Sequence, residues 1–116
     1  MIMYLNWIDL LSAFEVSPDT PGGADFAELV LRLVNHYRWT GERAKINETV
    51  MSMCRDRRCT SRQLYGGMKK AVHNILISDD AALELWEILP EKRTSSMLAV
   101  AIAEREIRRI DTETKT

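Results

Sequence analysis

The 116-residue chain has little of what marks disordered, secreted or membrane-spanning proteins. Its three prolines and five glycines are too few for a low-complexity chain. No apolar run approaches the roughly 20 residues that a membrane-spanning helix needs. Residues 1–4 carry no basic side chain, and no small-residue cleavage site follows them. We therefore expect no signal peptide and a cytoplasmic protein.

Signatures of metal sites and of catalysis are also scarce. The two cysteines, Cys54 and Cys59, lie five positions apart, whereas a zinc site needs closely spaced pairs and further ligands. The two histidines, His36 and His73, are isolated. The chain has no phosphate-binding glycine loop, no His-Glu-x-x-His and no nucleophile elbow. We expect no metal, no cofactor, no small-molecule substrate and no enzyme activity, and reduced thiols with Cys54 on a buried face.

The residues that are present fit one globular domain. The 46% of hydrophobic residues is enough for a core, and no linker or repeat divides the chain. No segment shows the period-two alternation of a β-strand. The sequence predicts an all-α bundle of about six helices, a single domain over 1–116 that contains a helix-turn-helix, with residues 111–116 as a flexible polar tail.

Apolar spacing and capping residues place the outer helices. Residues 2–14 carry an apolar stripe at helical spacing, formed by Tyr4, Trp7, Ile8, Leu11 and Phe14. Pro18 and Pro21-Gly22-Gly23 predict a loop after it. Asp79-Asp80 predicts the start of a short helix that ends before Pro90, and Thr94-Ser95-Ser96 predicts the cap of a last helix.

The clearest helix is predicted over residues 25–39. Asp25 and Glu28 fit a capping box at its start, and Gly41 marks its end. The apolar stripe of this helix comprises Phe26, Leu29, Val30, Leu33, Val34 and Tyr37. His36 lies off the stripe, which indicates a surface position.

Two further helices are predicted in the centre of the chain, at about 46–56 and 61–77. The first has Ile46, Val50, Met53 and Cys54 on one face. The second begins with Thr60 as N-cap and Gln63 three residues later. Its apolar stripe is formed by Leu64, Met68, Ala71, Val72, Ile75 and Leu76. Because the stripe keeps its phase across Gly66-Gly67, we favour one continuous helix over a short helix that ends at residue 65.

Positive charge gathers in the same central region. Residues 38–70 hold nine basic side chains against three acidic ones, whereas the rest of the chain holds seven basic and fourteen acidic ones. Such segregation fits a surface that faces phosphates. It fits equally well a solvated helix face that forms salt bridges with the acidic remainder.

The order helix, short turn, helix is that of a helix-turn-helix, whose second helix enters the major groove of DNA. Arg, Lys and Gln side chains on that helix suit base edges, and the turn and the helix N-terminus suit phosphates. The candidate DNA-binding residues are Arg57, Arg58, Thr60, Arg62, Gln63, Tyr65, Gly66, Lys69 and Lys70.

Two segments carry a resemblance that extends over roughly residues 5–110. They run from Thr60-Ser61-Arg62-Gln63-Leu64 to Lys69-Lys70-Ala71-Val72, and from Lys92-Arg93-Thr94-Ser95-Ser96 to Ile107-Arg108. The chain resembles the C-terminal effector domain of the stage-zero sporulation response regulator A family. This resemblance implies a six-helix domain that binds double-stranded promoter DNA, often as a pair of copies, and that contacts an RNA polymerase sigma factor.

The resemblance places recognition-helix contacts on Gln63, Tyr65, Gly66, Lys69 and Lys70. The chain departs from the family pattern at the first three of these, where the family has strongly charged readers. The phosphoacceptor receiver domain has no counterpart in the sequence. Two hypotheses follow: a DNA-binding transcription regulator without a receiver domain, or a protein-interaction module of the same fold that has lost DNA binding. In the second, Gln63, Tyr65 and Gly66-Gly67 would contact a sigma factor, a related regulator or a second copy.

Overall fold

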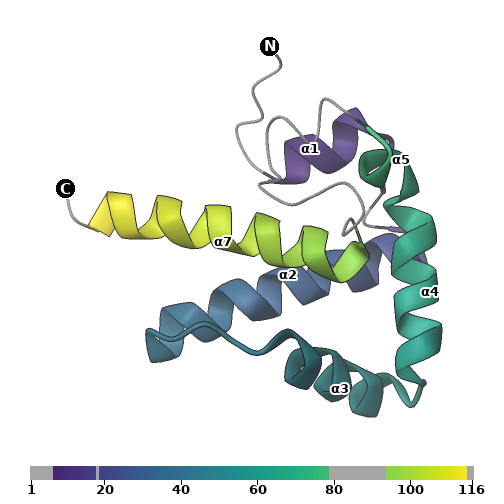
Figure 1. Cartoon of the computed structure of the whole chain (residues 1–116), viewed down its shortest axis with the longest axis horizontal. Coiled ribbons are helices and arrows are strands. Elements are labelled where there is room, and N and C mark those ends of the chain that lie inside the picture. Colours follow the sequence, from purple (N-terminus) through teal and green to yellow (C-terminus); the bar gives the residue numbers. More distant parts are fainter. Residues whose placement is uncertain (1–6, 18, 79–93, 115–116) are drawn as a thin grey trace.

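The computed structural model describes residues 7–17, 19–78 and 94–114. These residues form helices and connecting turns without a strand, which confirms the all-α prediction (Figure 1). The helices are α1 (Trp7–Ala13), α2 (Pro21–Thr40), α3 (Ile46–Arg57), α4 (Ser61–Ala71), α5 (His73–Leu76) and α7 (Ser95–Thr114). The short helix predicted between Asp79 and Pro90 lies outside the described residues. Among the helices described, none has the length and apolar composition needed to cross a membrane.

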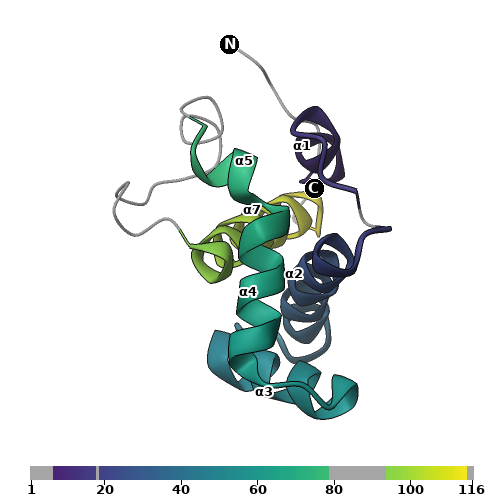
Figure 2. The same ribbon diagram turned by 90° about the vertical axis from the view of Figure 1, so that its right-hand side faces the viewer.

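Helix α2 is the centre of the bundle. It packs against α3, α4 and α7, and α4 crosses it at a steep angle near its N-terminal end (Figures 1 and 2). Its predicted stripe is confirmed, because five side chains of the stripe are buried: Phe26, Leu29, Val30, Leu33 and Val34. Their partners from the neighbouring helices include Val50, Met53, Leu64, Met68, Leu98 and Ile102.

Helix α2 begins earlier than the sequence indicated. Its N-cap is Thr20, whose side chain accepts a hydrogen bond from the Gly23 amide, and Pro21 is the first helical residue. The predicted N-cap at Asp25 is therefore wrong, and the supposed loop at 21–23 is the first helical turn. A hydroxyl N-cap followed by proline is a favourable helix start, since proline lacks the amide hydrogen that would be unpaired there.

The crossing of α2 and α4 explains the glycine at position 22, whereas a Cβ atom added at Gly67 would make only an ordinary contact, 4.0 Å from the Gly22 Cα atom. A Cβ atom added at Gly22 would lie 2.4 Å from the carbonyl oxygen of Gly67. The two backbones therefore meet closely at this point, as glycine permits. The pair Gly66-Gly67 is helical, which confirms the continuous helix across it, but the helix is interrupted at Val72, between α4 and α5.

The first and last helices differ in part from their predictions. In α1 the buried side chains are Leu10 and Leu11, whereas Ile8, expected in the stripe, is exposed. The predicted cap of α7 is present, since the Thr94 hydroxyl accepts a hydrogen bond from the Met97 amide. Helix α7 continues to Thr114, so the polar tail does not begin at residue 111. The Tyr37 hydroxyl donates to the Asp111 carboxylate at 2.8 Å, which joins this last turn to α2.

Candidate nucleic-acid interface

The connection between α3 and α4 is a tight turn of three residues, 58–60. Arg58 adopts the left-handed conformation, with φ 54° and ψ 44°. The Cys59 amide donates to the Cys54 carbonyl at 3.1 Å, and the Arg58 amide donates to the Arg55 carbonyl at 3.4 Å. This pair of hydrogen bonds is a Schellman motif, which ends α3 and turns the chain sharply into α4. Figure 2 shows the two helices crossing steeply, as the two helices of a helix-turn-helix do.

The start of α4 is fixed by the predicted capping box. The Gln63 amide donates to the Thr60 hydroxyl at 3.1 Å, and the Thr60 amide donates to the Gln63 side-chain oxygen at 2.9 Å. Both candidate DNA-binding side chains therefore already have partners in the protein. They hold the helix N-terminus in place, and that N-terminus is exposed together with the residues 60–63.

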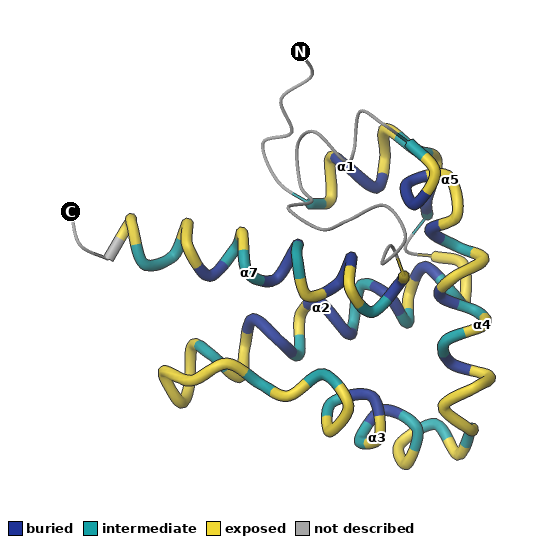
Figure 3. Tube along the Cα trace, in the orientation of Figure 1, coloured by how far each residue is buried: buried dark blue, intermediate teal, exposed yellow. Residues whose placement is uncertain are grey.

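The side of α4 that faces away from the core carries exposed residues along its length (Figure 3). We define the outward face of α4 as the exposed residues Arg62, Gln63, Gly66, Lys69 and Lys70. At about 100° per residue, Arg62, Gly66 and Lys69 form one row along the helix, and Gln63 and Lys70 lie beside it. Helix α4 contains no acidic residue. The outward face is therefore cationic.

Three candidate cations of this face are available to a ligand. Within the described part of the chain, Arg62, Lys69 and Lys70 form no ion pair. Arg58, exposed in the turn, also forms none there. Arg62, Lys69 and Lys70 lie within about 100° of one another around α4, and Arg58 lies in the turn that leads into this helix.

Arg57 is not part of this surface, contrary to the sequence prediction. Its guanidinium lies 2.7 Å from Asp25 and 2.6 Å from Glu28, both on α2. The hydrogen bond from Arg57 holds the pKa of the Glu28 carboxyl below its usual value. Arg32 extends the network by pairing with Asp56 at 2.7 Å. Arg57 therefore fastens α3 to α2 and positions the helix-turn-helix.

Tyr65 is also misplaced by the sequence prediction. It is half-buried and packs against the hydrophobic core, together with Cys54 and Cys59. Burial, and then the neighbouring Cys54, raise the pKa of its hydroxyl. The four residues expected to contact a protein in the protein-interaction hypothesis therefore differ in exposure. Gln63 and Gly66 are exposed, whereas Tyr65 and Gly67 are half-buried.

Two exposed residues on the neighbouring helices α3 and α5 were absent from the candidate set. Arg55 lies in the last turn of α3, and His73 lies at the start of α5. The helical spacing of His73 from Arg62 and Lys69 was visible in the sequence. Arg55 precedes the Schellman turn that ends α3. The sequence did not indicate this turn, because its left-handed residue is Arg58 rather than a glycine.

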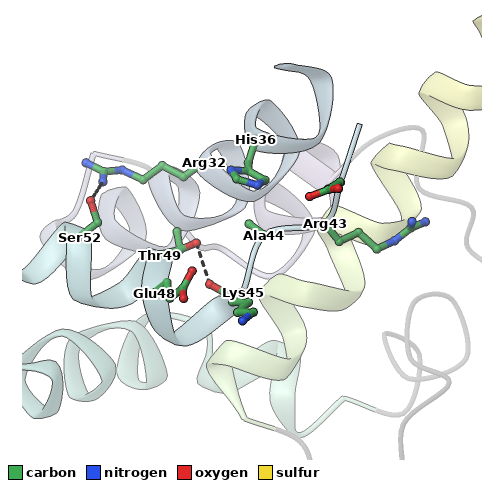
Figure 4. A pocket seen from close by; sticks show the side chains of 9 residues that line it. Arg32, His36, Arg43, Ala44, Lys45, Glu48, Thr49 and Ser52 are labelled. Atoms are coloured by element: carbon green, nitrogen blue, oxygen red, sulfur yellow. Dashed lines mark hydrogen bonds between the residues drawn. The ribbon is translucent and has the colours of Figure 1, made fainter. Parts of the chain in front are cut away.

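A separate hollow of about 430 Å³ lies between the end of α2 and the start of α3 (Figure 4). Basic and acidic side chains line it together. Arg32 turns toward Ser52, and Arg43 points away toward α7, where it pairs with Glu104 at 2.7 Å. Because its two arginines are neutralised by protein carboxylates, this hollow offers less to an anion than the outward face of α4.

The described residues contain no cluster of three or more side chains that could hold a metal ion. No family model, no curated protein and no solved structure matches the chain. The resemblance to the sporulation regulator family therefore rests on the sequence pattern alone.

Proposed function

We propose that the protein is a DNA-binding transcription regulator of the helix-turn-helix type, which binds double-stranded DNA with the outward face of α4. The observation that carries the proposal is that some basic side chains are paired with carboxylates and those on α4 are not. Arg32, Arg43 and Arg57 are paired with carboxylates, whereas Arg62, Lys69 and Lys70 form no ion pair in the described residues. Unpaired cations gathered on one helix are the electrostatic footprint of a phosphate-binding surface.

The shape of the unit supports the same function. The N-terminus of α4 is exposed, and the helix dipole there favours a phosphate, while the capping box already satisfies the Thr60 and Gln63 amides. Gly66 lies in the middle of the outward face, and a Cβ added there would meet no heavy atom within 4 Å. Since nothing in the described fold requires this glycine, it leaves room for the close approach of a nucleic-acid backbone.

The promoter context belongs to the proposal as well. The resemblance to the sporulation regulator effector domain supports transcription regulation in the cytoplasm, pairing of two copies on DNA and contact with a sigma factor. None of these is needed for the binding step, which depends only on the surface of α4 and the turn.

The test is an anisotropy titration of a fluorescent DNA duplex with the purified protein. Replacing Lys69 or Lys70 with Gln should weaken binding. The matched control is Arg38→Gln, since Arg38 is exposed at the other end of α2, roughly 24 Å along that helix from Gly22. Equal losses for Lys69→Gln and Arg38→Gln, or no binding by the parent protein, would contradict the proposed surface.

A further inference from the structure

We infer that the outward face of α4 recognises the phosphate backbone of duplex DNA and discriminates little between base sequences. This inference rests on the proposed function and specifies which part of the duplex the surface contacts. It departs from what a helix-turn-helix ordinarily does, which is to read base edges with the N-terminal residues of its second helix. The side chains at these positions of α4 determine whether the helix can read base edges.

Gln63 is the residue best suited to read adenine, because a glutamine can donate to and accept from one adenine at the same time. In this structure its side-chain oxygen accepts the Thr60 amide at 2.9 Å. Turning the carboxamide toward a base would break the capping box and leave that amide without its partner. Gln63 is therefore exposed, but its carboxamide is engaged in the cap of α4.

The next two candidate residues, Tyr65 and Gly66, offer no replacement. Tyr65 is half-buried beside Cys54, so its ring is part of the packing between α3 and α4. Gly66 has no side chain. The N-terminal half of α4 is thus left with Arg62 as its one exposed, unpaired cation among the described residues, and Ser61 is the other exposed side chain there without a partner in that part of the chain.

One arginine cannot supply the discrimination of a specific site. A good bidentate contact to one base pair discriminates by roughly 5- to 150-fold. Specific binding typically exceeds non-specific binding by roughly 10³- to 10⁷-fold. Lys69 and Lys70 lie further along the helix, and each is a flexible point charge suited to a phosphate. The cations of this surface can therefore hold the duplex, but one arginine falls far short of the discrimination of a specific site.

The experiment combines selection from a random duplex pool with titrations of single duplexes of different base composition. We expect dissociation constants that agree within about 5-fold, the smallest difference that one bidentate base contact would give, and therefore no enriched motif. Arg62→Gln should weaken every duplex by a similar factor, because a phosphate contact has no sequence preference.

The outcomes separate this inference from the function on which it rests. An enriched motif bound more than about 5-fold more tightly than random duplexes would overturn the inference and leave DNA binding intact. A loss for Arg62→Gln that is confined to duplexes with one particular guanine would overturn it too. If the full-length protein binds no duplex at low salt, both the inference and the proposed function fail.

Discussion

Replacing Gly66 with alanine should stabilise the protein, although Gly66 lies on the surface proposed to bind DNA. The position is helical, and a Cβ atom there meets no described heavy atom within 4 Å. A glycine inside a helix costs roughly 0.8–1 kcal/mol relative to alanine. Gly66→Ala should therefore raise the free energy of unfolding by about that amount, which corresponds to a rise in Tm of roughly 4 °C for a domain of this size.

Gly22→Ala is the matched comparison, because the same substitution should have the opposite effect. Its Cβ atom would lie 2.4 Å from the Gly67 carbonyl oxygen and 3.1 Å from the Ala71 Cβ atom. To relieve this overlap, α2 must move away from α4, and such overpacking costs about 1–3 kcal/mol. Urea unfolding followed by circular dichroism at 222 nm measures both variants, with the slope of the transition expected to stay unchanged.

The free energies of unfolding of the two variants test the packing of α2 against α4. The affinity of Gly66→Ala for duplex DNA tests the outward face of α4. A destabilised Gly66→Ala protein, or a Gly22→Ala protein as stable as the parent, would refute the geometry assigned to the two glycines. If a duplex backbone approaches Gly66 closely, the more stable Gly66→Ala protein should bind duplex DNA more weakly. Unchanged affinity in that variant would refute the close approach.

Three further predictions follow from the contacts around the turn. Glu28→Gln should lower stability at pH 7 by on the order of 0.5–1 kcal/mol, because its half-exposed pair with Arg57 is lost. The pKa of Glu28 is lowered in the folded state, so this contribution is present above its usual pKa of about 4.5 and is lost as the pH falls. The difference in the free energy of unfolding between variant and parent should therefore shrink between pH 6 and pH 3. A difference that stays constant over this range would contradict the pairing. Thr60→Ala should cost about 0.5–2 kcal/mol in urea unfolding through loss of the capping box, and no loss would show that the cap does not hold α4. Burial raises the pKa of the Cys54 thiol, so in a Cys59→Ser protein iodoacetamide should alkylate the single remaining thiol more slowly than in the urea-unfolded chain at the same pH; equal rates would contradict the burial.

Local patterns predicted most of the helices. The stripe of α2 and the capping box at Thr60 and Gln63 depend on residues three or four apart, and both are present. The early start of α2 was missed because Pro21-Gly22-Gly23 is typical of a loop. Its helical state depends on α4, which approaches Gly22 from 45 positions further along the chain.

The candidate site depended on contacts that the sequence does not encode locally. Arg57 was expected in the DNA surface, but its partners Asp25 and Glu28 lie about 30 positions earlier in the chain. Tyr65 was expected to face outward, but it is half-buried against the hydrophobic core, with Cys54 of α3 as a neighbour. Charge clustering therefore pointed to the helix on which the proposal rests, whereas the side chains that remain available to a ligand were set by tertiary packing.

The central claim, that the turn and the outward face of α4 bind phosphates, is tested most directly by the salt dependence of duplex binding. Contacts by Arg58, Arg62, Lys69 and Lys70 predict a slope of about −3.6 in a plot of log affinity against log salt concentration. The Lys69→Gln/Lys70→Gln double variant should reduce the slope to about −1.8, and Arg38→Gln should leave it unchanged. A slope that is the same in all three proteins, or affinity that does not respond to salt, would contradict the account.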